Sequence, residues 1–169
     1  LMLHTRLKIN GDDTTQPLIS KDNKLFLIIN GEIFNWHKLE KHLDYKCTMS
    51  DCEIIFPLYE KYKNNIPEML RMLEGQFSFV LYDLENKHIL VARDPIGVRS
   101  LYMGVNIDGE YGFCSELKGI NNLLDHIEQF KPGCVWDSNT KVFTPYYQCD
   151  KLYTTNLIPA HFPISMVSG

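Results

Sequence analysis

Short runs of apolar residues alternate with polar ones along most of the chain, and one run is longer than its neighbours. Residues 25–29 are five consecutive apolar residues, two of them β-branched, which predicts a strand buried on both faces. The run stops at Asn30-Gly31, and Glu32 follows at once. Because Asn-Gly is a strong hairpin signal, one interpretation is a simple turn. The other is a strand end that presents an amide, a glycine N–H and a carboxylate together.

Other patterns in the first half predict one more strand and three short helices. Residues 1–9 alternate between apolar and polar side chains, which predicts a strand with Arg6 near its end. A first helix is expected from an Asn35 N-cap through residue 43. A second opens with the capping box Ser50-x-x-Glu53 and is expected to kink at Pro57. A third is expected over residues 67–75.

The second half of the chain predicts β-hairpins. Apolar strands are expected at residues 77–82 and 89–93, at 101–105 and 111–114, and at 135–136 and 142–143. A short helix is expected to begin at residue 115. From residue 151 the chain has two prolines and no sustained period. We therefore expect one domain over residues 1–150 and a linker over residues 151–169.

Composition narrows the class of protein. The chain has 169 residues, enough for one domain with a real core. A net charge of −4 and the lack of a long apolar run predict neither a nucleic-acid partner nor a membrane span. The five cysteines are an odd number without Cys-x-x-Cys spacing. They predict reduced thiols in the cytoplasm, with no metal site and no disulfide framework.

Four polar groups lie at predicted element ends: Arg6, Asn30-Gly31-Glu32, Asp51 and Arg93-Asp94. An arginine fork fits a carboxylate, Glu32 and Asp51 suit an ammonium group, and the Asn30 amide with the Gly31 N–H suits an oxyanion. Together they describe a pocket for a free α-amino acid whose side-chain carbonyl is attacked. Each also has a simpler explanation, as a solvated strand arginine, a hairpin turn, a helix-start acid and a polar turn.

A resemblance decides between these interpretations. Seven ordered motifs between residue 4 and about residue 148 resemble those of class II glutamine amidotransferases, and the set looks like the glutaminase domain of glutamine-hydrolysing asparagine synthetases. The motifs are His4-x-Arg6-Leu7-x-Ile9, Gln16-Pro17-Leu18, Asn30-Gly31-Glu32-Ile33-Phe34-Asn35, Ser50-Asp51-Cys52-Glu53, Arg93-Asp94-Pro95-Ile96-Gly97-Val98-Arg99-x-Leu101-Tyr102, Ser115-Glu116-x-Lys118 and Phe130-x-Pro132-Gly133.

The resemblance implies a fold and a set of residue roles. The fold would be α+β, a four-layer αββα sandwich of the N-terminal-nucleophile type. Arg6 would bind the α-carboxylate of L-glutamine, with Leu7, Lys8, Ile9 and Asn10 continuing that wall. Asn30 and Gly31 would form the catalytic oxyanion hole, and Glu32 and Asp51 would hold the substrate amino group. No metal ligand is expected among these residues.

The family nucleophile is an N-terminal cysteine whose own amine acts as base, whereas this chain begins with Leu1. We therefore expect a domain incomplete at its N-terminus, and a chain that is inactive by itself. The parent protein would be an ATP- and Mg-dependent ligase that makes asparagine, with a synthetase domain as partner and a homodimer as a further expectation; no cofactor is expected in this chain. The alternatives are a non-catalytic amino-acid-binding or structural remnant, and the glutaminase domain of another class II amidotransferase.

Overall fold

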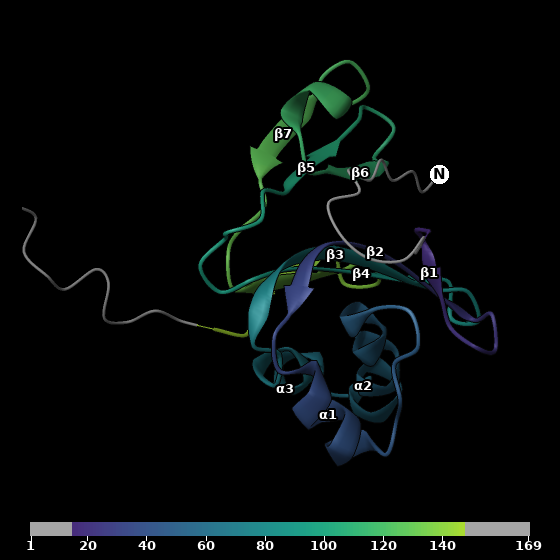
Figure 1. Cartoon of the computed structure of the whole chain (residues 1–169). Helices are drawn as coiled ribbons and strands as arrows, with labels where there is room; N and C mark the ends of the chain where they lie inside the picture. Colours follow the sequence, from purple (N-terminus) through teal and green to yellow (C-terminus); the bar gives the residue numbers. More distant parts are fainter. Residues whose placement is uncertain (1–14, 148–169) are drawn as a thin grey trace, which may run out of the picture.

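The computed structural model describes residues 15–147 as helices and two antiparallel sheets stacked in layers. Three α-helices cover one face of a six-stranded sheet, and a three-stranded sheet lies over its other face (Figure 1). The helices are α1 (Trp36–Leu43), α2 (Ile55–Tyr62) and α3 (Ile66–Arg71), with the 3₁₀ turns η1 (Asp51–Ile54) and η2 (Leu117–Gly119). The layers agree with the expected α+β sandwich, although beyond the second sheet the described residues contribute only η2 as a helical element.

All strand pairs are antiparallel. The six-stranded sheet has the order β1-β2-β3-β4-β8-β9, and the three-stranded sheet has the order β6-β5-β7. The strands are β1 (Leu18–Ile19), β2 (Leu25–Ile33), β3 (Gly75–Asp83), β4 (His88–Arg93), β5 (Tyr102–Val105), β6 (Tyr111–Cys114), β7 (His126–Gln129), β8 (Cys134–Asp137) and β9 (Val142–Pro145). The three predicted hairpins are thus confirmed.

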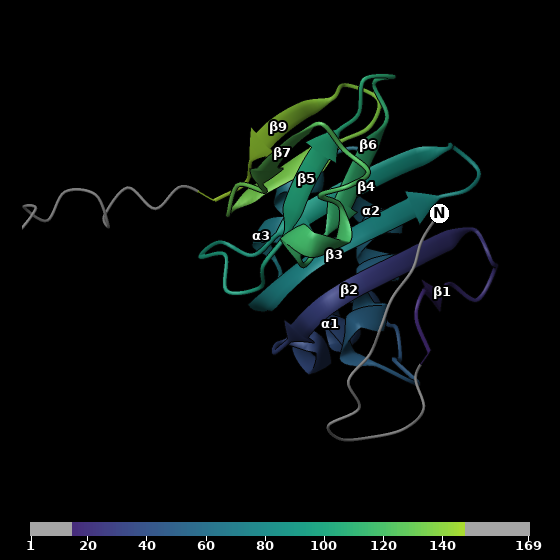
Figure 2. The same cartoon turned by 90° about the horizontal axis from the view of Figure 1, so that it is seen from above.

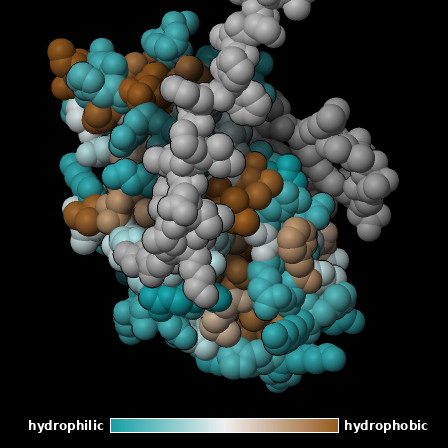
Figure 3. Space-filling model, turned by 90° about the vertical axis from the view of Figure 1, so that its left-hand side faces the viewer, coloured by the Kyte–Doolittle hydropathy of each residue, from teal (hydrophilic) through white to brown (hydrophobic). Residues whose placement is uncertain are grey.

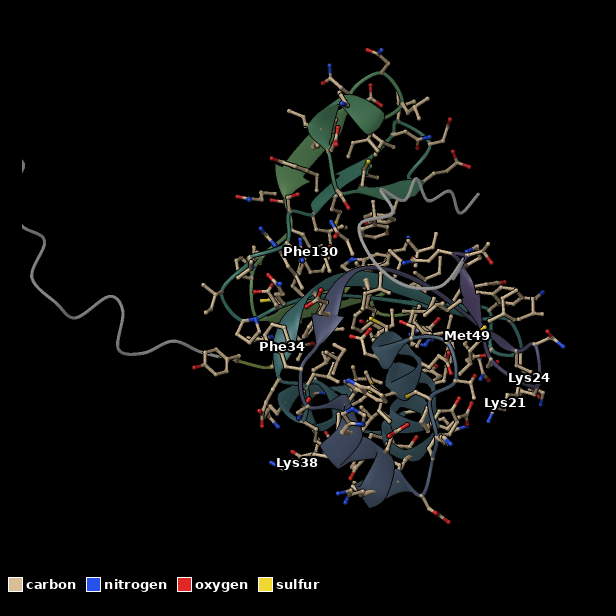
Figure 4. The ribbon with its side chains drawn as sticks, viewed as in Figure 1. Lys21, Lys24, Phe34, Lys38, Met49 and Phe130 are labelled. Atoms are coloured by element: carbon tan, nitrogen blue, oxygen red, sulfur yellow. The ribbon has the colours of Figure 1, made fainter. Side chains whose placement is uncertain are left out.

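Two hydrophobic cores lie on the two faces of the six-stranded sheet. The larger one packs α1, α2 and α3 against the sheet and includes Leu27, Leu58 and Phe77. The smaller one lies between the two sheets and includes the buried Phe130, which is labelled in Figure 4, and the buried Trp136. No described helix is long and apolar enough to cross a membrane. On the side view of Figure 3, the apolar surface outside the grey atoms is divided into patches by polar side chains.

The prediction that the central strand is buried on both faces is wrong. In β2 the odd-numbered Leu25, Leu27 and Ile29 are buried under the helices, whereas Phe26 and Ile28 are half-buried on the other face. The smaller sheet covers only part of this second face. The strand also continues through Asn30-Gly31 to Ile33, so these residues do not form a hairpin turn.

Several helix predictions need correction. Asn35 precedes α1, but its side chain makes no cap hydrogen bond there. The Ser50–Glu53 capping box is confirmed, yet it opens η1, and Pro57 falls in the first turn of α2, where no kink is needed. The third helix ends at Arg71 because Gly75 already belongs to β3. The expected boundary at residue 150, the linker over 151–169 and the strand over 1–9 lie outside the described residues.

Candidate active site

Strand β2 has one fully paired edge and one partly paired edge. β3 pairs with all nine residues of β2, whereas β1 pairs with two of them, at one end (Figure 2). Successive backbone groups of a strand point to opposite edges. Lys24 O accepts a bond from Leu84 N–H at 2.9 Å on the β3 side, and Leu25 O accepts from Ser20 N–H at 3.0 Å on the β1 side. The backbone N–H and C=O groups of the odd-numbered residues of β2 therefore point away from β3.

Two side chains occupy this second edge beyond β1. The Gln16 amide accepts a hydrogen bond from Ile29 N–H and donates one to Ile29 O, both at 2.8 Å. The Asp51 carboxylate accepts from Ile33 N–H through Oδ2 at 2.6 Å. Its other oxygen accepts from the Ser50 hydroxyl at 3.2 Å. The capping box thus places Asp51 beside the end of β2.

Gly31 lies between these two side-chain contacts. Its N–H points to the same edge as those of Ile29 and Ile33, and no acceptor for it lies within the described part of the chain. Its C=O faces the Cys52 thiol, 3.8 Å away. With φ +149°, a Cβ at this position would collide with the Gln76 carbonyl oxygen and come within 2.7 Å of Phe77 Cα. Only glycine fits this close approach of β2 to β3.

Asn30 and Glu32 flank Gly31 on the opposite face of β2 from the helix-side core. Asn30 is half-buried and lies opposite Ser78 of β3, and Glu32 is exposed opposite Gln76. Neither side chain has a hydrogen-bond or ion-pair partner among residues 15–147. The structure therefore brings together an unpaired N–H, an amide and two carboxylates. The expected Arg6, Leu7, Lys8, Ile9 and Asn10 lie outside the described residues.

Arg93 and Asp94 do not belong to this group of ligands. The buried Arg93 guanidinium donates to the carbonyls of Arg99, Phe130 and Gly97 at 2.7, 2.7 and 2.8 Å. The Asp94 carboxylate accepts from four backbone N–H groups of residues 96–99. The pair organises the loop after β4 and ties it to the second sheet, so its role is structural.

Three of the four described cysteines, Cys47, Cys52 and Cys134, are poor nucleophiles because burial disfavours their thiolates. Burial, together with Glu40 and Glu53, raises the pKa of the Cys47 thiol to about 12. Burial is also the main cause of the raised pKa of Cys52, to which Asp51 and Glu32 add. Burial raises the pKa of Cys134 as well. No group of three His, Cys, Asp or Glu side chains among residues 15–147 could hold a metal ion.

A groove of about 520 Å³ lies elsewhere, between the β1–β2 turn and the helices α1 and α2. Leu25, Leu43 and Phe56 supply apolar lining, and Lys21 and Lys61 supply charge. None of the predicted site residues lines it, so the chemistry assigned to the β2 edge does not extend into this groove.

Comparison with known proteins identifies the family. The family described as "Glutamine amidotransferase domain" matches residues 1–161. The chain belongs to this family. A probable glutamine-hydrolysing asparagine synthetase of Schizosaccharomyces pombe is 41% identical over 95% of this chain, and asparagine synthetase 2 of Lotus japonicus is 43% identical over 86%. The chain covers 29% and 25% of those proteins. It is thus homologous to the glutaminase part of asparagine synthetases.

Solved structures support the amidotransferase fold. Glutamine phosphoribosylpyrophosphate amidotransferase from B. subtilis matches with a TM-score of 0.67 and 26% identity, over 81% of this chain and 33% of that chain. The sandwich expected of an N-terminal-nucleophile amidotransferase domain is therefore confirmed. Sequence reasoning named Asn30, Gly31, Glu32 and Asp51 as candidate site residues. It listed Gln16 within a motif but assigned it no role, because a glutamine before proline does not show by itself which backbone group it will bind.

Proposed function

We propose that this amidotransferase domain binds L-glutamine at the β2 edge. The observation that supports the proposal is the N–H of Gly31, which has no acceptor among the described residues at the second edge of β2 and lies next to the Asn30 amide. These two donors suit the side-chain carbonyl oxygen of glutamine and the negative charge that develops on it during hydrolysis. Glu32 and the Oδ1 atom of Asp51 suit the α-ammonium group, and Arg6 with residues 7–10 is assigned to the α-carboxylate.

The parent protein is proposed to be an asparagine synthetase. It would take ammonia released from glutamine and use it, with ATP and Mg bound in a separate synthetase domain, to convert aspartate to asparagine. The support is the homology to glutamine-hydrolysing asparagine synthetases. A cytoplasmic location, a homodimeric parent, and the absence of nucleic-acid or membrane partners belong to the same proposal, as does the assignment of residues 1–150 to the domain and 151–169 to a linker.

We further propose that the 169-residue chain binds glutamine without hydrolysing it. Hydrolysis needs a thiolate beside a base, whereas burial raises the pKa of Cys47, Cys52 and Cys134. In this proposal the isolated chain is a non-catalytic amino-acid-binding domain, and glutaminase activity belongs to the parent protein.

Calorimetric titration of the chain with L-glutamine tests the binding step. We expect binding of L-glutamine and none of D-glutamine, with Glu32→Gln weakening binding by about 10-fold through loss of a charge-assisted bond. Glu128→Gln, on the exposed strand β7, is the matched control and should bind as the wild type does. Equal binding of both enantiomers would contradict the assigned site. Release of glutamate above a no-protein control would contradict the proposed inactivity.

A further inference from the structure

The Gln16 side chain replaces a backbone residue in the sheet. A residue of a neighbouring antiparallel strand would exchange one N–H and one C=O with Ile29. The Gln16 amide supplies the same two groups from its side chain, with both bonds at 2.8 Å. The backbone ladder of β1 ends at Leu27, two residues before Ile29. From Ile29 onward, among the described residues, side chains rather than a strand occupy this edge.

Among the described residues, this arrangement leaves one backbone N–H of the edge between Ile29 and Ile33 unpaired. Gln16 satisfies Ile29, and Asp51 satisfies Ile33 N–H from the other direction at 2.6 Å. Gly31 is the odd-numbered residue between them. A backbone strand continuing beside β2 would present an acceptor to the Gly31 N–H as well, whereas a side-chain amide ends at the residue it binds. Gln16 therefore pairs with Ile29, the last odd-numbered residue before Gly31, and supplies no acceptor to the Gly31 N–H.

We propose that Gln16 is a positioning residue for the oxyanion hole: its side-chain amide holds the β2 edge in strand geometry while leaving the Gly31 N–H free for a ligand oxygen. The inference rests on the proposed glutamine site, since it assigns a purpose to the opening at Gly31. Gln16 itself touches no ligand in this arrangement and acts through Ile29.

The chain offers a matched control in Asn35. Its amide also makes two backbone bonds, donating to Met72 O at 2.8 Å and accepting from Glu74 N–H at 3.0 Å. These bonds support the same end of the sheet from the α3–β3 connection, away from the Gly31 edge. Asn35→Ala therefore removes an equivalent pair of bonds without touching that edge.

Hydrogen exchange of the ¹⁵N-labelled full chain tests the inference without ligand. In the wild type we expect the Ile29 amide to be protected and the Gly31 amide to exchange much faster. Gln16→Met keeps the side-chain length and removes both bonds, so Ile29 exchange should rise about 10-fold. Asn35→Ala should leave both amides unchanged. A Gly31 amide as protected as Ile29 in the wild type would overturn the proposal.

Titration of the same samples with L-glutamine separates this inference from the proposed function. We expect the Gly31 amide resonance to shift in the wild type and Asn35→Ala, with about 10-fold weaker binding in Gln16→Met. Wild-type binding that Gln16→Met retains in full would overturn the role of Gln16. No binding by the wild type would overturn the glutamine site, and Ile29 exchange would still report on Gln16. If Gln16→Met does not fold, Gln16→Glu replaces it, because this variant keeps the acceptor for Ile29 N–H and removes the donor to Ile29 O. Glutamine binding by Gln16→Glu that is as tight as in the wild type would overturn the positioning role of Gln16.

Discussion

Gly31 is the residue on which the geometry of the candidate site depends most directly. Two constraints coincide there, a positive φ and the close approach of the Gln76 carbonyl oxygen. Gly109 shares a positive φ, but a Cβ there would meet nothing within 4 Å. A comparison of alanine substitutions at Gly31 and Gly109 therefore separates the cost of backbone strain from the cost of a steric clash.

We predict that Gly31→Ala lowers the free energy of unfolding by about 3 kcal/mol or more, because strain and overpacking add. Gly109→Ala should cost about 1 kcal/mol, from strain alone. Urea denaturation of the two variants and the wild type measures both values. Equal costs would show that β2 and β3 can separate enough to admit a methyl group.

Residues of the site could be predicted from sequence where their chemistry is local. Asn30, Gly31 and Glu32 are adjacent in the chain, and Asp51 is marked by the capping box beside it. Gln16 could not be predicted in the same way, because its function depends on which residue of β2 lies opposite it. That register is set by the packing of the whole sheet and not by the segment around Gln16.

At the scale of elements, the hairpin β3–β4 is tied to its neighbours by a network of titratable side chains. Tyr59 of α2 donates to the Asp83 carboxylate at 3.0 Å, and His88 contacts the Asp137 carboxylate at 2.8 Å. Burial alone would raise the pKa of both carboxyls. Hydrogen bonds from Asn86 and Tyr59 at Asp83, and from backbone N–H groups and His88 at Asp137, outweigh it and lower both pKa values.

A lowered folded-state pKa stabilises the protein above the unfolded-state pKa, and that contribution is lost as the pH falls through the folded-state value. We therefore expect the contribution of Asp83 and Asp137 to stability to be constant at neutral pH and to fall below about pH 4. Asp83→Asn should flatten the acid branch of the profile, measured as urea midpoints from pH 7 to pH 2. The exposed Asp108→Asn is the control, and identical acid branches for both variants would refute the expectation.

The elements found from sequence are those whose pattern is local. Short apolar runs separated by turn residues located β3, β4 and the other hairpin strands, and Ser50 with Glu53 located the start of η1. Strand β7 was missed because three of its four residues are exposed and polar, so pairing with β5 creates it. Asn35 was misjudged for a related reason: its amide binds Met72 and Glu74, which are distant in the chain.

At the scale of the whole molecule, Arg93 connects the two sheets. It belongs to β4 of the larger sheet and binds the carbonyl of Phe130, which lies between the sheets, as well as the loop that leads to β5. Lysine has a single ammonium group in place of the guanidinium fork and cannot reach three carbonyls together.

We predict that Arg93→Lys lowers the free energy of unfolding by about 3 kcal/mol, because buried carbonyls lose their donor. Trp136 lies in the core between the sheets, whereas Trp36 packs on the helix side. In a Trp36→Phe background, Trp136 fluorescence should therefore report loosening between the sheets. Arg71→Lys, at a partly exposed arginine that bonds one backbone carbonyl, is the control. Unchanged Trp136 emission and stability in Arg93→Lys would contradict this role.

The pairing of the β2 edge on either side of the Gly31 N–H also affects aggregation. A foreign strand adds to a sheet edge when it finds several unpaired backbone groups in register, which is how fibrils grow. On the described part of this edge, β1 pairs with the first residues of β2, the Gln16 amide binds the backbone of Ile29, and the Asp51 carboxylate accepts from Ile33 N–H. One free N–H is enough to hold a ligand oxygen but too little to template a strand. The side chains of Gln16 and Asp51 thus limit the pairing of a second copy of the chain at this edge of β2.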